Sequence, residues 1–466
     1  MGGQRAHPFN TWVVRAGVLS IVAVLLVSAR SALGVPAFAR KYGTSCLTCH
    51  TVYPKLNPFG EAFRRNGFLF PGVDSDYVKQ ETVALGQDAN KKEFPNSVWP
   101  GTLPGGVPLA VGFNGEAVFH PNKGSGGAMA DNQAGVNLND LVAEGHLWAA
   151  GSFDDHITFF GELTTSEGST ELELANVRFN DLIKSAHALD VAVGKFAPTL
   201  SSFAPHSSYL SDSPITPLSV TALYGATSDS WNVGNNYNGV EANGTLHGRL
   251  DYSVGANAGS NVEVQSVGDY YAHVGYKFGG VRLDAEKGSA VPDPKKPWAE
   301  TALTLDAFYY RSSSRFAASD ESIWDDVAST FGGGVRAQWS SLEVDVGAYQ
   351  ERHDHAQASG DAVRGLTGFG EVSYVVYPWL VPALRVEYLK LSPDGGTTVT
   401  DLRMVAGVAA LIRPNLKLTL AALVERANGA PPGGWGPASG MAAPATATDS
   451  VGPELEAVTL GLAFAF

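Results

Sequence analysis

Apolar and polar residues alternate one by one along most of the chain after residue 105, which is the period of a β-strand whose two faces meet different surroundings. In the last segment, EAVTLGLAFAF, one face carries Val458, Leu460, Leu462, Phe464 and Phe466, while the other carries mainly alanine, threonine and glycine. Repeats of this pattern predict an all-β fold with about sixteen strands of some ten residues each between residues 107 and 466.

The connections between the predicted strands alternate in length. Tight turns are expected at 247–248, 340–341, 377–379 and 413–415, and long polar loops at 120–137, 197–235, 312–330 and 428–452. Short turns at one rim and long loops at the other are typical of a bacterial transmembrane antiparallel β-barrel, and an even strand number places both termini at the periplasmic rim. The connection 279–299 is long where a short turn is expected, so it has room for a further pair of strands. A large soluble protein of several sheets would also alternate and is the competing fold.

In a barrel of this size the two faces of each strand have different roles, because the wide lumen holds water and the outside meets lipid. The aromatic residues that we expect at the membrane interfaces are Tyr252, Tyr276, Trp339, Tyr374 and Tyr388. The polar residues that we expect to face the lumen are His146, Asp251, His273, Lys277, Asp306, Arg336, Glu371, Arg385, Glu387 and Arg403.

The N-terminus has the features of an export signal. Arg5 and Arg15 precede or flank an apolar run at 16–27, which is too short to span a bilayer as a helix. Small-residue patterns after this run are candidate cleavage sites. They predict a signal peptide over 1–34, and the latest of these sites would place the cleavage at residue 39. The net charge of −14 and the absence of a basic stripe exclude nucleic acid as a partner.

Both cysteines of the chain lie three positions apart in SCLTCHTVYP (45–54), with a histidine directly after the second. A zinc site would need further ligands, yet there is no other cysteine and no histidine between His50 and His120. A thioredoxin-like redox pair would need a strand before it and a helix after it, whereas these flanks read as turns and a short helix. The third chemistry is a covalent c-type haem, in which Cys46 and Cys49 form thioethers and His50 is an axial ligand of the iron. The motif therefore predicts one haem c.

A small helix is predicted next to this motif, with Asn57 as its N-cap. Phe59 and Phe63 are four positions apart and share one face, which we expect to pack on the porphyrin. Arg64 or Arg65 would then meet the propionates, with a solvated helix face as the alternative for both. So short a segment cannot bury a useful core alone, so we expect it to form a plug inside or at the mouth of the barrel.

The sixth ligand of the iron is not evident, because this segment holds no second histidine and the methionines beyond the signal lie far along the chain. There are three alternatives for this position. It is taken by a lumen-facing histidine, with His146 as the first candidate, it is taken by a weaker ligand, or it is open. His353 and His355 form a separate candidate site. They could project together from an extended chain and bind a divalent metal near the outer surface, and the alternative is that they belong to an ordinary loop.

Residues 38–68 resemble the N-terminal signature of the fused outer-membrane cytochrome–porins, the family of the iron-oxidising outer-membrane monohaem c-type cytochromes. The matching positions are Cys46, Cys49, His50, Thr51, Tyr53, Pro54, Leu56, Phe59, Gly60, Phe63 and Arg64. The resemblance implies that one haem in a porin passes electrons between an extracellular donor or acceptor, Fe(II) or another redox partner, and periplasmic carriers such as soluble c-type cytochromes. The terminal Phe466 resembles the signal that barrel-assembly machinery reads.

The expected organisation is a signal peptide (1–34), a c-type cytochrome segment (35–70), a linker or plug (71–105) and a porin-like barrel (106–466) in contact with the lipid of a Gram-negative-type outer membrane. Two functions compete with electron transfer. One is a solute-selective porin whose haem is structural, and the other is a haem peroxidase-like enzyme that uses an open iron position.

Overall fold

The computed structural model describes residues 37–465 apart from several short stretches and loops. The gaps are 71–73, 75–76, 80–81, 85–87, 97–101, 105–107, 122–134, 139–140, 154–155, 167–168, 184–186, 201–219, 225–231, 233–234, 259–267, 285–294, 318–322, 357–359 and 433–449. The predicted signal peptide and Phe466 lie outside the described residues.

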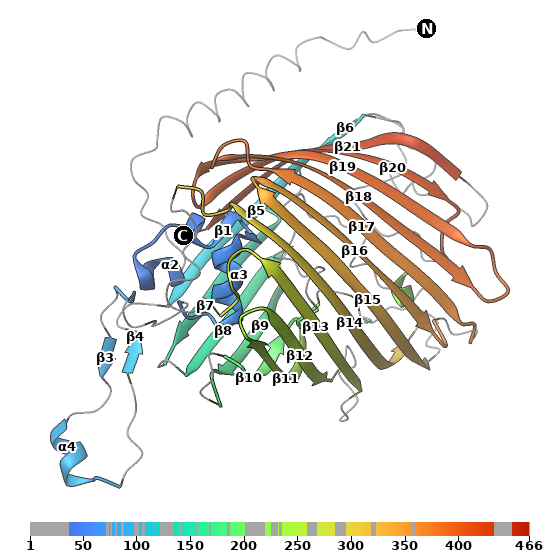
Figure 1. Ribbon diagram of the computed structural model, residues 1–466. Coiled ribbons are helices and arrows are strands. Elements are labelled where there is room, and N and C mark those ends of the chain that lie inside the picture. The colour runs from blue at the N-terminus through green and yellow to red at the C-terminus, as the bar shows by residue number, and fades with distance from the viewer. Residues whose placement is uncertain are drawn as a thin grey trace.

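The described strands close into one antiparallel barrel (Figure 1), so the predicted fold class is confirmed. Sixteen of them form the wall: β5 (Leu109–His120), β7 (Glu144–Ser152), β8 (Ile157–Ser166), β9 (Ser169–Phe179), β10 (Asp190–Phe196), β11 (Tyr237–Leu246), β12 (Leu250–Asn257), β13 (Asp269–Gly279), β14 (Glu300–Ala317), β15 (Ile323–Ser340), β16 (Leu342–His353), β17 (Val363–Tyr374), β18 (Leu380–Pro393), β19 (Val399–Arg413), β20 (Leu416–Asn428) and β21 (Ser450–Ala465). Pairing of β21 with β5 closes the ring, and the short β6 (Gly135–Asn137) pairs with β5 alone.

The expected alternation of short and long connections is present only in part, since 280–299 is long among the short turns and β8 and β9 are joined by two residues among the long loops. The predicted long loop at 312–330 is wrong, because β14 and β15 continue through it and pair without interruption from Glu300↔Ser340 to Ala317↔Ile323. Ser312 and Ser314 are buried on the inner face of β14, so this part of the strand alternates in burial but not in polarity. The long connection 280–299 holds no strand among its described residues.

The outer surface of the wall is apolar. On β16, Val346 is 50% exposed and lies between the buried Asp345 and Gly347, and the same in–out pattern continues along the neighbouring strands. Charged residues instead gather on the inner face. A closed barrel with an apolar outside and a polar inside leaves no unpaired strand edge in lipid, which is the architecture of an outer-membrane barrel. The protein is therefore an outer-membrane barrel with a porin-like wall.

The expected interface aromatics divide into two groups. Tyr276, Trp339 and Tyr374 are exposed and lie close to the short turns, as interface residues should. Tyr388 is also exposed but lies nearer the middle of its strand, while Tyr252 is half-buried. Among the helices of the described residues, none is long and apolar enough to cross a membrane.

Replacing Val346 by arginine is expected to destabilise the barrel in lipid by about 2–4 kcal/mol, because the charge would face the hydrocarbon. Gln350, on the same outward face of β16 but nearer the long loops, supplies the matched control. Gln350→Arg should cost about 0–1 kcal/mol. The measurement is equilibrium folding into phospholipid vesicles, and equal costs for both variants would contradict the lipid-facing assignment.

The inner face carries the predicted lumen residues. Asp251, His273, Lys277, Glu371, Arg385, Glu387 and Arg403 are buried there. His146, Asp306 and Arg336 are partly buried on the same side of the wall. Two inserted segments cover them.

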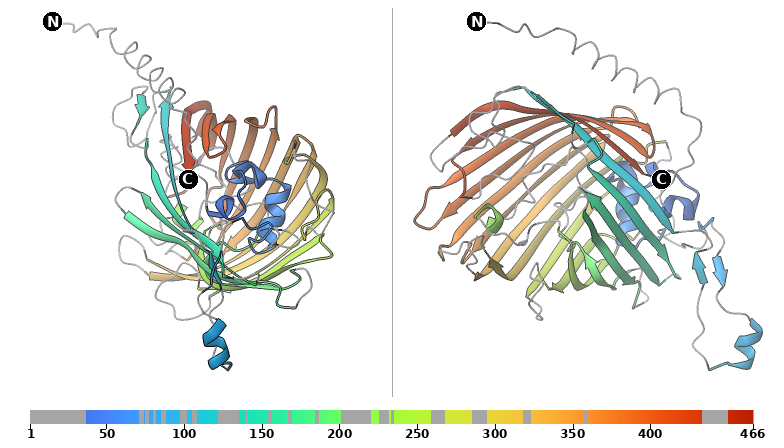
Figure 2. Two further views of the ribbon diagram at one scale, coloured as in Figure 1. Left: turned by 90° about the vertical axis from the view of Figure 1, so that its left-hand side faces the viewer. Right: turned by 180° about the vertical axis from the view of Figure 1, so that it is seen from behind.

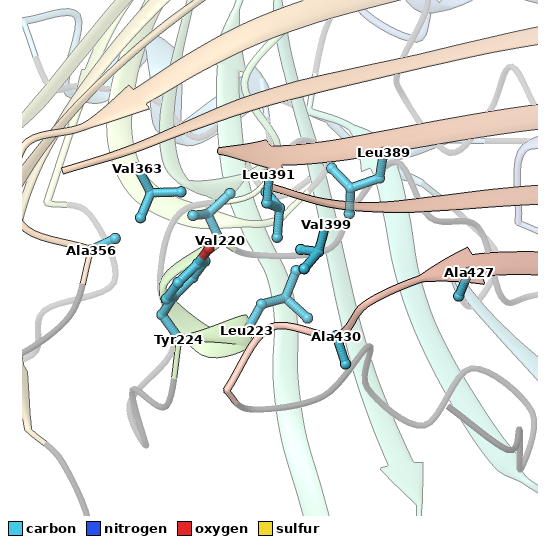
Figure 3. Close-up of a cluster of buried hydrophobic side chains, with 10 residues drawn as sticks. All are labelled: Val220, Leu223, Tyr224, Ala356, Val363, Leu389, Leu391, Val399, Ala427 and Ala430. Atoms are coloured by element: carbon cyan, nitrogen blue, oxygen red, sulfur yellow. The ribbon is translucent and has the colours of Figure 1, made fainter. Parts of the chain in front are cut away.

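One inserted segment is the loop between β10 and β11. Its helix α5 (Val220–Leu223) lies inside the barrel, where Val220, Leu223 and Tyr224 pack in one cluster with Leu391 and Val399 of the opposite wall (Figure 3). Helix α5 therefore lies against β18 and β19, on the side of the barrel opposite β10.

The other inserted segment is N-terminal and lies in the barrel mouth beside the short turns (Figure 2). It consists of α2 (Ala37–Tyr42), the 3₁₀ turn η1 (Cys46–Thr48), β1 (His50–Val52), β2 (Lys55–Leu56) and α3 (Pro58–Arg65). We call residues 37–70 the plug. The hairpin of β3 (Thr82–Ala84) and β4 (Thr102–Pro104), with α4 (Asp88–Glu93) between them, lies outside the barrel.

Candidate functional site

The plug folds the CxxCH motif into one tight loop. The Ser45 hydroxyl accepts a hydrogen bond from the backbone N–H of Leu47, and the N–H of Cys49 donates to the Cys46 carbonyl at 3.2 Å. His50 begins β1 and pairs with Leu56 of β2. Both cysteines are free thiols, so two sulfur atoms and an imidazole come from one five-residue turn.

The His50 ring is oriented by a backbone carbonyl. Its Nδ1–H donates to the Pro54 carbonyl at 3.1 Å, which leaves the lone pair on Nε2. Metal-binding histidines commonly hold their other ring nitrogen in this way, which fixes the tautomer and the ring orientation. Burial lowers the pKa of His50 to about 4. The hydrogen bond to the Pro54 carbonyl raises this pKa, but its effect is smaller than that of burial. The imidazole is therefore neutral at pH 7, the form that a metal requires.

The two thiols are not arranged as a zinc site or a redox pair. Among the described residues no three His, Cys, Asp or Glu side chains come together to hold a metal ion. The motif is a 3₁₀ turn followed by a two-strand hairpin, whereas the redox alternative requires a βαβ unit. Burial raises the pKa of Cys49 to about 12 and also raises the pKa of Cys46. Two thiols followed by an imidazole with a free Nε2 are the donor set that a covalent haem c uses.

Asn57 joins the motif to helix α3. Its side-chain amide donates to the carbonyls of Leu47 (3.1 Å) and Thr48 (3.0 Å), while its Oδ1 accepts from the Gly60 N–H at 2.9 Å. The backbone N–H of Asn57 also donates to the Cys49 carbonyl at 2.9 Å. This residue is therefore the N-cap that the sequence predicts and, in addition, a brace for the motif loop.

Replacing Asn57 by alanine is expected to destabilise the plug by about 1–3 kcal/mol, because buried carbonyls and the helix cap lose their partners. Faster cleavage of the plug by a protease added to the detergent-solubilised protein measures this effect. Asn176→Ala is the matched control, since Asn176 makes one long hydrogen bond of 3.4 Å to Lys195 on the wall. Equal cleavage rates in the two variants would show that Asn57 does not brace the motif.

Gly60 allows α3 to approach the motif closely. A Cβ atom at this position would lie 1.9 Å from the Cys49 carbonyl oxygen, which is backbone and cannot move aside independently. A glycine is therefore required where the helix crosses Cys49, the second cysteine of the motif.

Buried ion pairs fix the plug to one side of the wall. The Nζ of Lys55 lies 2.6 Å from Glu343, 3.2 Å from Asp345 and 3.3 Å from Glu371, and all four residues are almost fully enclosed. Arg336 donates to the Leu56 carbonyl at 3.3 Å. Strands β15, β16 and β17 thus hold the residues that directly follow the motif.

The end of α3 is fixed to the other side of the wall. Arg65 forms an ion pair with Asp251 of β12 at 2.6 Å, and Arg178 of β9 donates to the Arg64 carbonyl at 3.1 Å. The amide of Asn66 donates to the Leu283 carbonyl at 3.0 Å. Since both walls contact the plug, its position relative to the barrel is well defined.

The aromatic and basic residues of α3 are used differently from the expectation. Phe63 is buried within the plug, with Phe38 at 5.2 Å and Tyr42 at 5.9 Å between ring centroids, so its ring is committed to internal packing. Phe59 is partly exposed, and its contact with a porphyrin stays a prediction. The alternative of a solvated helix face is wrong for Arg65, because its side chain forms an ion pair with Asp251 of the wall.

The structure places His146 on the barrel wall. Its Nδ1 lies 2.9 Å from Glu162 and its Nε2 lies 3.0 Å from the Asn114 side-chain oxygen. The ring also stacks on Trp148 at 5.1 Å. Both nitrogens are therefore engaged in this arrangement, and the identity of the sixth ligand stays open.

The expected pair of His353 and His355 does not form a metal site. His353 is buried on the inner face, where its Nδ1 lies 2.6 Å from Asp326. His355 is exposed, with its Nδ1 3.2 Å from the Asp325 carbonyl. Two positions along an extended chain would share a face, but β16 ends at His353, so the two rings diverge.

No family model and no curated protein matches the chain. Similar solved structures include OmpT of Vibrio cholerae (11% identity, 79% of this chain and 98% of that chain, TM-score 0.47) and the channel DcaP of Acinetobacter baumannii (12%, 77% and 96%, 0.47). An anion-selective porin from Comamonas acidovorans is 10% identical over 77% of this chain and 98% of that chain, with a TM-score of 0.48. Likenesses of this size assign no function.

Proposed function

We propose that the protein is an outer-membrane monohaem c-type cytochrome built on a porin-like barrel. It carries one haem c on Cys46 and Cys49 with His50 as axial ligand. It exchanges electrons between an extracellular donor or acceptor, such as Fe(II) or another redox partner, and periplasmic carriers such as soluble c-type cytochromes. The observation that carries this proposal is the His50 ring, held through Nδ1 with Nε2 free, in the same turn as two unpaired thiols.

A covalent haem supplies an iron that takes up and gives back one electron at a time. The chain contributes the position of this group. The plug lies at the rim of the short turns, which is the periplasmic rim of an outer-membrane barrel, and so presents the motif to soluble periplasmic partners. Lys55 on one side and Arg65 on the other keep the motif fixed relative to the wall.

The barrel contributes the route from outside. An apolar wall about 25 Å tall insulates against electron transfer through the bilayer, and electrons tunnel only over short gaps. Charged residues such as Glu387 and Arg403 lie on the inner face of this wall but are buried, so an extracellular partner would have to reach the motif past the segment inserted between β10 and β11.

A second candidate function is a solute-selective porin in which the haem is structural. The observation that favours it is the barrel itself, a closed wall with ion pairs such as Arg385–Glu387 at 2.6 Å on its inner face. Under this alternative, solute permeability is the activity and the motif only stabilises the plug.

The test of the proposal is a comparison of the wild type with the double variant Cys46→Ala, Cys49→Ala in liposomes that contain an electron acceptor. The wild type should keep its red colour after denaturation and acid extraction, because thioether bonds hold the haem, and should reduce the acceptor when Fe(II) is added outside. The double variant should be colourless and inactive. A wild type that is red but reduces no acceptor with any external donor would favour the porin.

A further inference from the structure

A pocket lies between the end of α3 and the inner wall of the barrel, apart from the CxxCH loop. Its lining residues are Arg64, Arg65, Arg178, Thr199, Asn243, Gly244, Thr245 and Tyr252. Three arginines therefore meet in one pocket, and no carboxylate is among the residues that line it. This is unusual in a chain whose net charge is −14.

The positive charge of the pocket is only partly balanced. Asp251 pairs with Arg65 at 2.6 Å, whereas the nearest carboxylate oxygen of Glu61 lies 3.8 Å from Arg64 Nε, beyond hydrogen-bond distance. Arg178 uses one of its nitrogens on the Arg64 carbonyl. Burial, followed by the neighbouring Arg65, lowers the pKa of Arg64 to about 10, so a bound anion would stabilise its charge.

Several guanidinium nitrogens in the pocket have no protein acceptor. In the part of the chain that the structure describes, Arg64 Nε and Nη2, Arg65 Nε and Arg178 Nε are buried and make no hydrogen bond. Buried donors of this kind carry a desolvation cost unless a ligand accepts from them. The neutral donors nearby are already used, because Thr199 and Asn243 both donate to Glu241.

We propose that this pocket binds an oxyanion, held by Arg64 of the plug and Arg178 of the wall. Guanidinium groups bind planar carboxylates and phosphates through paired N–H···O bonds, so a ligand with at least two negatively charged oxygens matches their chemistry. The pocket volume is about 10 Å³, which holds about one water, so the arginine side chains must move apart to admit such a ligand. Since one arginine comes from the plug and the other from β9, the anion would also join the plug to the barrel. Two sources supply this chemistry: a free oxyanion such as phosphate in the lumen, or a propionate of the haem carried by the motif.

The experiment is calorimetric titration of the full-length, detergent-solubilised protein with inorganic phosphate, against sodium chloride at the same ionic strength. Arg64→Gln is the test variant, because among the described residues the ion-pair partner of the Arg64 side chain is Glu61 at 3.8 Å, a long contact whose loss the fold should tolerate. Arg315→Gln is the control, since Arg315 is an exposed residue of β14 and pairs with the exposed Asp325 of β15. We expect Arg64→Gln to weaken phosphate binding about tenfold or more and Arg315→Gln to leave it unchanged.

The outcomes separate the two sources. Phosphate binding by the wild type that Arg64→Gln weakens indicates a free oxyanion. A second outcome is that the wild type does not bind phosphate, whereas the haem-free double variant Cys46→Ala, Cys49→Ala does. If Arg64→Gln also weakens binding to that variant, a haem propionate fills the pocket in the mature protein. Phosphate binding by neither chain, or equal binding with and without Arg64, overturns the proposal. The free-anion result does not depend on haem attachment, so a failure here and a failure of the proposed function are distinguishable.

Discussion

Replacing His50 by alanine is expected to reduce electron transfer across liposomes to the rate without protein, while the barrel remains folded. Under the proposed function the imidazole would be the one axial ligand that the motif supplies, and its Nδ1 hydrogen bond to the Pro54 carbonyl holds it in place. Without it the iron loses both a ligand and the control that this ligand has over the reduction potential. The measurement is reduction of an enclosed acceptor after Fe(II) is added outside.

A graded variant makes this test sharper. His50→Met keeps an axial ligand of a kind that c-type cytochromes use and should raise the reduction potential, so it should recover part of the transfer with a shifted potential. His146→Ala is the matched control, because His146 is also a histidine of the barrel interior but is engaged with Glu162 and Asn114. Equal transfer rates in the wild type and His50→Ala would remove the electron-transfer proposal and leave the porin.

The barrel could be predicted from the sequence because a strand that separates lipid from a charged lumen must alternate. The prediction failed where that contrast disappears. Between Ser312 and Ser314 both faces of β14 are polar, since this part of the strand lies beyond the apolar band of the wall, and a polar run looks like a loop. Only its pairing with β15, which is a non-local contact, identifies it as a strand.

The candidate site was predictable to the extent that its chemistry is local. The spacing of Cys46, Cys49 and His50 is set by covalent geometry within five residues, so the sequence alone identifies it. The groups that hold this motif are different, because Lys55 and Asp345 are 290 positions apart and nothing in the local sequence links them. A lysine between a proline and a leucine gave no signal that it would be buried.

That lysine gives the second large expected effect. Lys55→Met should release the plug from the barrel mouth, because the buried carboxyl groups of Glu343, Asp345 and Glu371 would lose the ammonium group that pairs with them. Removing one partner of a buried ion pair costs about 3–5 kcal/mol, whereas the wall is closed by its own strand pairing and should stay folded. The expected result is rapid proteolysis of the plug together with a higher solute permeability of the barrel.

The control and a rescue variant decide whether the cause is electrostatic. Lys195→Met removes a half-buried lysine of β10 that donates to the Leu172 carbonyl and is remote from the plug in sequence, and it should change neither quantity. Adding Glu343→Gln to Lys55→Met removes one of the stranded charges and should restore part of the protease resistance, because the destabilisation comes from uncompensated carboxylates and not from lost volume. If the double variant is no more resistant than Lys55→Met alone, the plug is held by packing, for which the cluster of Val52 with Val381 and Ala409 is the structural basis.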